Sequence, residues 1–323
     1  MQKVLITHQL PGERIHELSS SSEVTVWMGP GLLGSKALRE ELKDCVGVIC
    51  MLTDRIDEEL LEACPQLKFI SSMSVGVDHI DVAAASERGI AVGNTPGVLV
   101  ETTADATFAL LLAASRRIAE ADLYVRGGHW NDENAWSPDF FVGKDVAGAT
   151  LGIIGLGEVG QAVSRRATGF AMRVLGWNHR DKSVPGVESV SLEQLLAESD
   201  FVCVTVALAS ETRHLLDADK LALMKHDAVL VNTSRGGIVD EEALVDALVN
   251  GRLGSAALDV FAREPLASDH PLVRLPNVVL TPHIGSATHD TRCEMANMAA
   301  ANALAALAEQ PMPSCVNPQI YER

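Results

Sequence analysis

Aromatic side chains are scarce in this chain of 323 residues, where phenylalanine, tyrosine and tryptophan make up only 4%. The core must therefore be built mainly from alanine, valine, leucine and isoleucine. Basic side chains are also few, because 26 lysines and arginines face 43 aspartates and glutamates, a formal net charge of −17. Such a surface repels phosphate backbones and anionic lipids, so we expect neither a nucleic-acid partner nor a membrane partner.

Long apolar runs and paired cysteine motifs are missing as well. The longest uncharged stretch of the C-terminal part, residues 295–308, is too short to span a bilayer. The N-terminal residues 1–7 are typical of a first strand rather than of a signal peptide. The six cysteines stand apart with no C-x-x-C pair, which argues against a disulfide framework and against a zinc site. We therefore expect a protein without a metal, in the reducing cytoplasm.

The chain does contain a regular alternation of short β-branched runs with segments of helical spacing. This alternation is typical of βαβ units around parallel sheets, and the length favours two domains. The strands expected in the first block are residues 3–7, 24–27, 46–50, 69–72 and 91–92. Those expected in the second block are residues 151–154, 173–177, 201–205, 228–232, 254–258 and 278–280. We predict an α/β fold of two Rossmann-like or flavodoxin-like domains with parallel sheets.

Two connecting segments carry expectations of their own. The four serines at residues 19–22 are interpreted as a polar turn between a helix and a strand. Residues 101–118 are apolar on most faces, as in a single helix buried between domains.

A glycine-rich loop opens the second block, directly after an apolar strand and before an amphipathic helix. Gly155, Gly157 and Gly160 occupy the three positions of G-x-G-x-x-G. The first glycine permits a tight turn, the second lets the backbone approach a pyrophosphate, and the third lets the helix pack close to the strand. The amides of the helix N-terminus would then face the phosphates. The expected dinucleotide contacts here are Gly155, Leu156, Gly157, Glu158, Val159 and Gly160.

The end of the next strand should select the cofactor. An enzyme that uses NAD usually carries Asp or Glu at this strand tip, to bind both ribose hydroxyls. Here the position falls on the neutral Asn178, and the guanidinium of Arg180 could pair with a 2′-phosphate and stack on adenine. Asp181 is the alternative acidic residue if the strand runs longer, or Arg180 and Asp181 merely cap a solvent-facing turn. We expect NADPH to be preferred, with NADH as the alternative, and assign Asn178, His179 and Arg180 to the cofactor site.

Three charged side chains follow the strands of the second block. Arg235 comes just after one buried strand, while Glu264 and His283 lie in the segments that follow the next two. Because the carboxyl ends of strands face the ligand crevice in open α/β sheets, all three could converge on one cofactor.

At these residues the chain resembles the D-isomer-specific 2-hydroxyacid dehydrogenase family, and within it most closely the glyoxylate/hydroxypyruvate reductases. The resemblance spans most of residues 69–313, with six motifs in register. They are the glycine loop, N-T-S-R-G-G-I-V-D at 232–240, L-D-V-F…E-P-L at 258–266, P-H-I-G-S-A-T at 282–288, and the pair S-V-G-V-D-H-I-D at 74–81 and N-T-P-G-V at 94–98.

The chemistry of such a reaction fits these residue types. Arg235 would hold the carboxylate and carbonyl oxygens of a 2-oxo acid through its planar fork. His283 would donate a proton as general acid, and Glu264 would orient the imidazole and favour its protonated form. Backbone amides of Val75 and Gly76 would help to bind the carboxylate.

The resemblance implies further contacts. Leu52 would line an apolar wall of the substrate pocket, and Trp136 would reach the site of a neighbouring subunit. Ala207 stands where many relatives have proline, so that the loop on the cofactor side is expected to sit differently. The remaining expected cofactor contacts are Ala207, Thr233, Ser234, Arg235, Asp259, His283 and Gly285.

From these observations we expect an NADPH-preferring enzyme that reduces hydroxypyruvate and glyoxylate to D-2-hydroxy acids. The alternatives are a reductase of another 2-oxo acid, 2-ketogluconate or a branched one, and a dinucleotide-sensing binding protein like the corepressors related to this family. The expected domains are residues 1–99 with 288–323 for the substrate and 100–287 for the dinucleotide, with the active site in the cleft between them. A homodimer is expected, with residues 101–118 and 127–143 as candidate interface.

Overall fold

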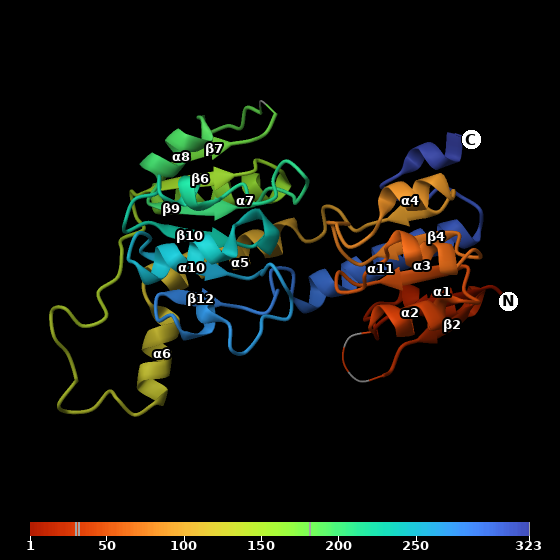
Figure 1. Ribbon diagram of the computed structural model, residues 1–323, viewed down its shortest axis with the longest axis horizontal. Coiled ribbons are helices and arrows are strands. Elements are labelled where there is room, and N and C mark those ends of the chain that lie inside the picture. The colour runs from red at the N-terminus through yellow and green to blue at the C-terminus, as the bar shows by residue number, and fades with distance from the viewer. Residues whose placement is uncertain (30, 32, 181, 323) are drawn as a thin grey trace. The chain divides into compact units, whose positions relative to one another are not determined.

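The computed structural model describes residues 1–29, 31, 33–180 and 182–322, and its chain divides into two compact units (Figure 1). The first unit combines Met1–Leu99 with Ala287–Arg323, and the second is Val100–Ser286. Each unit is built on its own parallel sheet. In the part of the chain that is described, no helix is both long and apolar enough to cross a membrane.

The first unit has a five-stranded sheet in the order β2-β1-β3-β4-β5. Its strands are β1 (Lys3–Ile6), β2 (Glu23–Val26), β3 (Gly47–Cys50), β4 (Phe69–Ser72) and β5 (Ala91–Gly93). Its helices are α1 (Arg14–Ser21), α2 (Ser35–Leu42), α3 (Glu58–Ala63), α4 (Val82–Glu87) and α11 (His289–Leu307), with a 3-10 turn at Pro318–Glu322. Buried aliphatic residues join α2, α3 and α4 to one face and α1 and α11 to the other. The sheet is therefore covered on both faces, as parallel sheets require.

The second unit has a seven-stranded sheet in the order β12-β11-β10-β9-β6-β7-β8. Its strands are β6 (Thr150–Ile154), β7 (Arg173–Trp177), β8 (Glu188–Ser189), β9 (Phe201–Val204), β10 (Val229–Asn232), β11 (Ser255–Leu258) and β12 (Val278–Leu280). Its helices are α5 (Val100–Ser115), α6 (Ile118–Arg126), α7 (Glu158–Ala167), α8 (Leu192–Glu198), α9 (Ala218–Leu221) and α10 (Glu241–Val249). Short 3-10 turns cover Thr168–Phe170, Gly236–Ile238 and Pro271–Arg274.

The strand order of this second sheet reverses next to β6, where β7 lies on one side and β9 on the other. Such a switch point leaves a crevice at the carboxyl ends of the strands, where α/β proteins bind their ligands. The predicted α/β class with two parallel sheets is confirmed. Strand β8, at the edge of this sheet, is the one that the sequence pattern did not predict.

The prediction of a turn at residues 19–22 is wrong. Ser19, Ser20 and Ser21 form the last turn of α1, and each hydroxyl donates a hydrogen bond to the carbonyl four residues earlier, at 3.0 Å. These local bonds let serine complete a helix in spite of its low propensity.

The expectation of one helix over residues 101–118 is also wrong. Helix α5 ends at Ser115, because Arg117 takes a left-handed backbone with φ of 52°, and α6 begins at Ile118.

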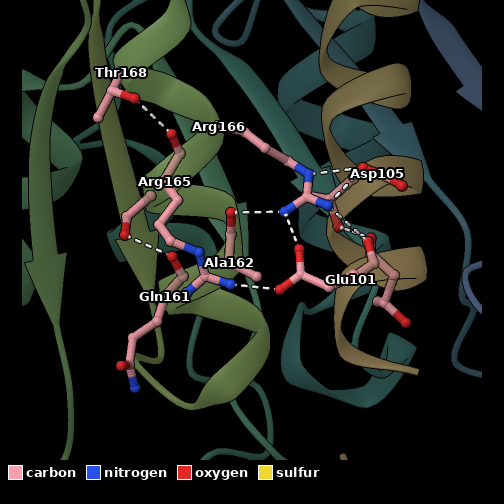
Figure 2. A network of polar contacts seen from close by, with 10 residues as sticks. Glu101, Asp105, Gln161, Ala162, Arg165, Arg166 and Thr168 are labelled. Atoms are coloured by element: carbon pink, nitrogen blue, oxygen red, sulfur yellow. Dashed lines mark hydrogen bonds and ion pairs between the residues drawn. The ribbon is translucent and has the colours of Figure 1, made fainter. Parts of the chain in front are cut away.

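A network of ion pairs fixes α7, which follows the glycine loop, against α5 (Figure 2). The guanidinium of Arg166, with 21% of its side chain exposed, pairs with Glu101 at 2.9 Å and with Asp105 at 2.6 Å. Arg165 adds a second pair to Glu101. Ion pairs that share one partly buried guanidinium form a network, and such a network fixes the relative position of two helices better than isolated surface pairs do. The C-terminal end of α7 is thereby held against the N-terminal half of α5.

Candidate active site

The glycine loop between β6 and α7 has a different constraint at each glycine. Gly155 takes a φ of +102°, and a side chain there would collide with the Val206 backbone, 2.5 Å away. A Cβ at Gly160 would lie 2.0 Å from the Gly155 carbonyl oxygen, so that only glycine lets the helix pack this closely. A Cβ at Gly157 would meet nothing within 4 Å. Packing within the chain therefore requires glycine at the first and third positions and leaves the second facing open space.

The residues of this loop fit a dinucleotide. Gly157 is the N-cap of α7 and provides no side-chain cap for the amides of the first helical turn. Such amides, with the positive end of the helix dipole, are suited to a pyrophosphate. The open space at Gly157 is where a phosphate could approach the backbone closely. Leu156, by contrast, is 1% exposed and packs in the core, so that only its backbone borders the loop.

The tip of β7 is tied to the glycine loop by Asn178. Its side-chain oxygen accepts the amide hydrogen of Leu156 at 3.1 Å, and its side-chain nitrogen donates to the carbonyl of Arg180 at 2.8 Å. The amide thus shapes the turn that carries the exposed His179 and Arg180. Asp181, the alternative acidic residue, lies outside the described residues.

The loop after β9 is braced by hydroxyl groups. The Ser234 hydroxyl donates to the Val206 carbonyl, and the Thr212 hydroxyl donates to the Ala207 carbonyl at 2.7 Å. The Thr233 hydroxyl lies 2.7 Å from that of Thr107 on α5. These bonds hold the loop at Ala207, and they engage the hydroxyls of Thr233 and Ser234 inside the protein.

Glu264 and His283 form a close pair at the carboxyl ends of β11 and β12. Oε2 of Glu264 lies 2.7 Å from Nδ1 of His283, and its Oε1 accepts the Phe261 amide hydrogen at 3.0 Å. This contact leaves Nε2 of the imidazole for a ligand. Burial would raise the pKa of Glu264, but hydrogen bonds from His283 and Phe261, with the charges of His283 and Arg235, hold that pKa below its ordinary value. The carboxylate therefore stays ionised beside the imidazole.

Asp259 shapes the backbone that presents His283, which takes a left-handed φ of 54°. One carboxylate oxygen of Asp259 accepts the Thr281 hydroxyl at 2.6 Å and the Ile284 amide at 2.8 Å, and the other accepts the Gly285 amide at 2.7 Å. The carbonyl of Asp259 also accepts the His283 amide at 2.9 Å. With both oxygens engaged and 1% exposure, Asp259 holds this unusual turn.

Arg235 follows β10, the strand between β9 and β11, so that it lies at the same sheet edge as the Glu264–His283 pair. Its Nη1 donates to the Ser234 carbonyl at 2.9 Å. Its positive charge contributes to the lowered pKa of Glu264, which indicates that the two side chains share one electrostatic environment.

In the first unit, Val75 and Gly76 lie in the loop that follows β4, at the carboxyl edge of its sheet. The half-buried Leu52 lies in the turn after β3. Asp54, 1% exposed, holds this turn by accepting the Met51 amide at 2.7 Å and the Thr7 hydroxyl.

Trp136 lies apart from the charged trio in the structure. It is 78% exposed, in the segment after α6, which extends away from the seven-stranded sheet in Figure 1. The structure therefore does not bring Trp136 to Arg235, Glu264 and His283 within this chain.

Sequence reasoning missed supporting residues such as Thr205 and Asp54, and it named Asp259 only as a cofactor contact. Thr205 donates its hydroxyl to the Gly155 carbonyl at 2.6 Å, Asp54 fixes the turn after β3, and Asp259 fixes the turn that presents His283. A threonine after a strand and a buried aspartate in an apolar run are weak signals, because many such residues cap turns without a ligand nearby. Among the described residues, no group of three or more His, Cys, Asp or Glu could hold a metal ion.

Comparison with known proteins places this geometry in a family. The model of the "D-isomer specific 2-hydroxyacid dehydrogenase, NAD binding domain" matches residues 108–285. A glyoxylate reductase of Korarchaeum cryptofilum is 47% identical over 324 residues, which cover 99% of this chain and 97% of that protein.

Two solved structures show the same fold. The TT0316 protein of Thermus thermophilus superposes with a TM-score of 0.90 at 46% identity, over 98% of this chain and 100% of that one. An NADPH-dependent glyoxylate/hydroxypyruvate reductase of Sinorhizobium meliloti, in complex with NADP and malonate, superposes with a TM-score of 0.88 at 30% identity, over 98% of each chain.

The fold and the glycine loop thus define an oxidoreductase that uses a nicotinamide dinucleotide. The chain belongs to the D-isomer-specific 2-hydroxyacid dehydrogenase family. Its reaction class is therefore hydride transfer between a 2-oxo acid and a 2-hydroxy acid.

Proposed function

We propose that this enzyme reduces glyoxylate and hydroxypyruvate to the corresponding 2-hydroxy acids, the D-isomer where the product is chiral, with NADPH as the preferred reductant. The observation that carries the proposal is the Glu264–His283 contact of 2.7 Å, at the same sheet edge as Arg235. Among the described residues, Arg235 is the cation whose charge acts on the Glu264–His283 pair, and one guanidinium suits a small monocarboxylate better than a dicarboxylate.

The proposed reaction uses three groups of this chain. A reduced nicotinamide, when bound, supplies the hydride that adds to C2 of the 2-oxo acid. The electron pair of the carbonyl double bond moves to its oxygen, which takes the proton from Nε2 of His283. Arg235 holds the carboxylate and polarises the carbonyl oxygen, while Glu264 keeps Nδ1 of the imidazole engaged. One hydride and one proton are consumed, and His283 is reprotonated from water.

The substrate carboxylate would also take amide hydrogens from Val75 and Gly76 of the first unit.

The NADPH preference is argued from the tip of β7. A carboxylate at position 178 would accept both ribose hydroxyls, whereas the neutral Asn178 already uses its oxygen on the Leu156 amide. The neighbouring Arg180 is exposed and able to face a 2′-phosphate.

The test of the cofactor and substrate is a matrix of initial rates, with NADPH or NADH against glyoxylate, hydroxypyruvate, pyruvate, 2-ketogluconate and a branched 2-oxo acid. We expect the highest kcat/KM with NADPH and the first two acids.

Arg180→Ala should raise the KM for NADPH about tenfold and leave the KM for NADH nearly unchanged, because a charge-assisted phosphate contact is lost. Arg252→Ala is the matched control, because Arg252 is also an exposed arginine and lies in the turn after α10. Turnover with NADH alone would overturn the cofactor preference, and binding of cofactor without any turnover would favour a dinucleotide sensor.

We also propose that the enzyme is a homodimer. Helix α6 buries none of its nine residues, and Leu123 and Val125 are 70% and 52% exposed. An isolated helix of this length is not stable without an apolar contact, so that a second copy of the chain would cover it.

We propose the cytoplasm as the compartment of this enzyme, because all six cysteines are free thiols.

A further inference from the structure

We propose that the C-terminal tail, the segment that follows α11, belongs to the substrate site. Ser314 of this tail and Asn302 of α11 act through Asn94 to hold the Val75–Gly76 loop with its amides directed outward. Asn94, Asn302 and Ser314 are then positioning residues for the substrate carboxylate. This inference rests on the proposed function, in which these two amides bind that carboxylate.

The carbonyl groups of three successive residues in this loop are tied back to the protein. The Ser74 carbonyl accepts the Thr95 amide at 2.9 Å, and the Val75 carbonyl accepts the side-chain nitrogen of Asn94 at 2.9 Å. The Gly76 carbonyl accepts the Ser74 hydroxyl at 2.7 Å. The amides of Val75 and Gly76 donate to no residue in the described part of the chain. Successive amides of this kind form a concave site for an anion.

Asn94 connects this loop to the C-terminal tail. Its side-chain oxygen accepts the Ser314 hydroxyl at 2.8 Å, while its side-chain nitrogen serves Val75. The orientation of the amide is fixed, because the Val75 carbonyl can only accept a hydrogen bond. A loss of the Ser314 hydroxyl would therefore free the end of Asn94 that is opposite the loop.

The Ser314 hydroxyl, the Asn94 side chain and the Val75 carbonyl form a relay of hydrogen bonds. Asn302 holds the backbone of Asn94 and of Ser314 beside this relay. Its side chain is 0% exposed in the alanine-rich helix α11, donates to the Asn94 carbonyl at 3.1 Å and accepts the Ser314 amide at 3.0 Å. A Cβ at Gly93 would lie 2.8 Å from the Asn302 side-chain nitrogen, so that a glycine is needed to admit it. A buried amide is costly unless its hydrogen bonds are satisfied, and here each end of Asn302 holds one partner of the relay.

The experiment compares Asn94→Ala, Ser314→Ala and the double variant, by steady-state kinetics with glyoxylate and NADPH. Asn94→Ala should raise the KM for glyoxylate about 5- to 10-fold, the effect of about one hydrogen bond, with the KM for NADPH unchanged and kcat within about twofold. Ser314→Ala should raise the KM for glyoxylate about 2- to 4-fold, and Ser314→Thr, which keeps the hydroxyl, should restore it. Asn297→Ala is the matched control, since Asn297 also lies on α11 but accepts the Arg14 amide, away from the loop.

Because Ser314 acts through Asn94, the double variant should be no worse than Asn94→Ala alone. Full additivity of the two effects would overturn the relay. So would an unchanged KM for glyoxylate in Asn94→Ala, or an equal rise in the KM for NADPH.

A binding measurement separates this inference from the proposed function. The probe is oxamate, a carboxylate that is not reduced, added to the ¹⁵N-labelled enzyme with NADP bound while the amide resonances of Val75 and Gly76 are followed. We expect both resonances to shift in the wild type and to require more oxamate in Asn94→Ala. Shifts without turnover of any 2-oxo acid would overturn the proposed function and support the positioning role. Turnover without shifts of these two amides would overturn the inference and leave the function standing.

Discussion

At the scale of single residues, the site depends on how His283 is held. Its ring is fixed from one side by Glu264 and its left-handed backbone by Asp259, which accepts hydrogen bonds from the residues on both sides. A general acid gains most when its geometry is set before the substrate arrives. The strain of the turn is thus offset by hydrogen bonds within the same loop.

The lowered pKa of Glu264 gives a prediction for stability. Because the pKa is below its ordinary value in the folded state, ionised Glu264 contributes stability that is full above about pH 4.5 and is lost as the pH falls through the folded pKa. Glu264→Gln cannot titrate, so that the difference in unfolding free energy between it and the wild type should shrink from about pH 6 to about pH 3.5. Urea unfolding at several pH values measures this difference, and a constant difference would contradict the assignment.

The residues at the strand ends could be predicted from the sequence, because the spacing after each apolar run determines which side chains reach the carboxyl edge. Arg235, Glu264 and His283 follow from this rule. The backbone of His283 and the role of Asp259 could not be predicted in this way. They depend on hydrogen bonds across more than 20 residues of sequence, and a non-glycine residue carries no local sign of a positive φ.

At the scale of secondary structure elements, two glycines in the turn from β6 to α7 have different roles, Gly160 in folding and Gly157 in cofactor binding. Gly160→Ala would place a Cβ 2.0 Å from the Gly155 oxygen and should lower the free energy of unfolding by about 1–3 kcal/mol or more. Gly157→Ala meets no atom of the chain, so that the melting temperature should stay near that of the wild type while the Kd for NADPH rises about tenfold or more.

Gly34→Ala is the control for this pair, because Gly34 is also the N-cap of a helix and also faces open space. Thermal unfolding and a fluorescence titration with NADPH measure the two quantities. A Gly157→Ala variant that binds NADPH as tightly as the wild type would show that the open space is not the phosphate site.

The break between α5 and α6 shows a feature that the sequence pattern could not predict. The apolar residues of α5 continue to Ile118, and so the pattern predicts one helix as far as that residue. The chain instead turns at Arg117, whose guanidinium pairs with Glu120 at 2.8 Å and lies 4.9 Å from the centre of the Phe141 ring. Because Phe141 lies far from Arg117 in the sequence, the local periodicity of α5 gives no sign of this contact.

At the scale of the whole molecule, the exposed face of α6 predicts the oligomeric state. Light scattering on the eluted protein should give twice the chain mass of 34.4 kDa. Leu123→Glu should shift the species to the monomer, because a charge in an apolar interface is strongly unfavourable. Val249→Glu on α10, where the side chain is 62% exposed, should leave the mass unchanged. A wild type that elutes as a monomer at all concentrations would refute the dimer.

The measurement that tests the central claim most directly is the turnover of glyoxylate by the wild type and by His283→Asn, followed at the absorbance of the reduced nicotinamide. Asparagine cannot act as a general acid, so that kcat should fall by about 10²- to 10⁴-fold, a much larger factor than any change in the Kd for NADPH. Equal turnover by both proteins would contradict the role of His283. A wild type that binds NADPH but turns over no 2-oxo acid would contradict the proposed function itself.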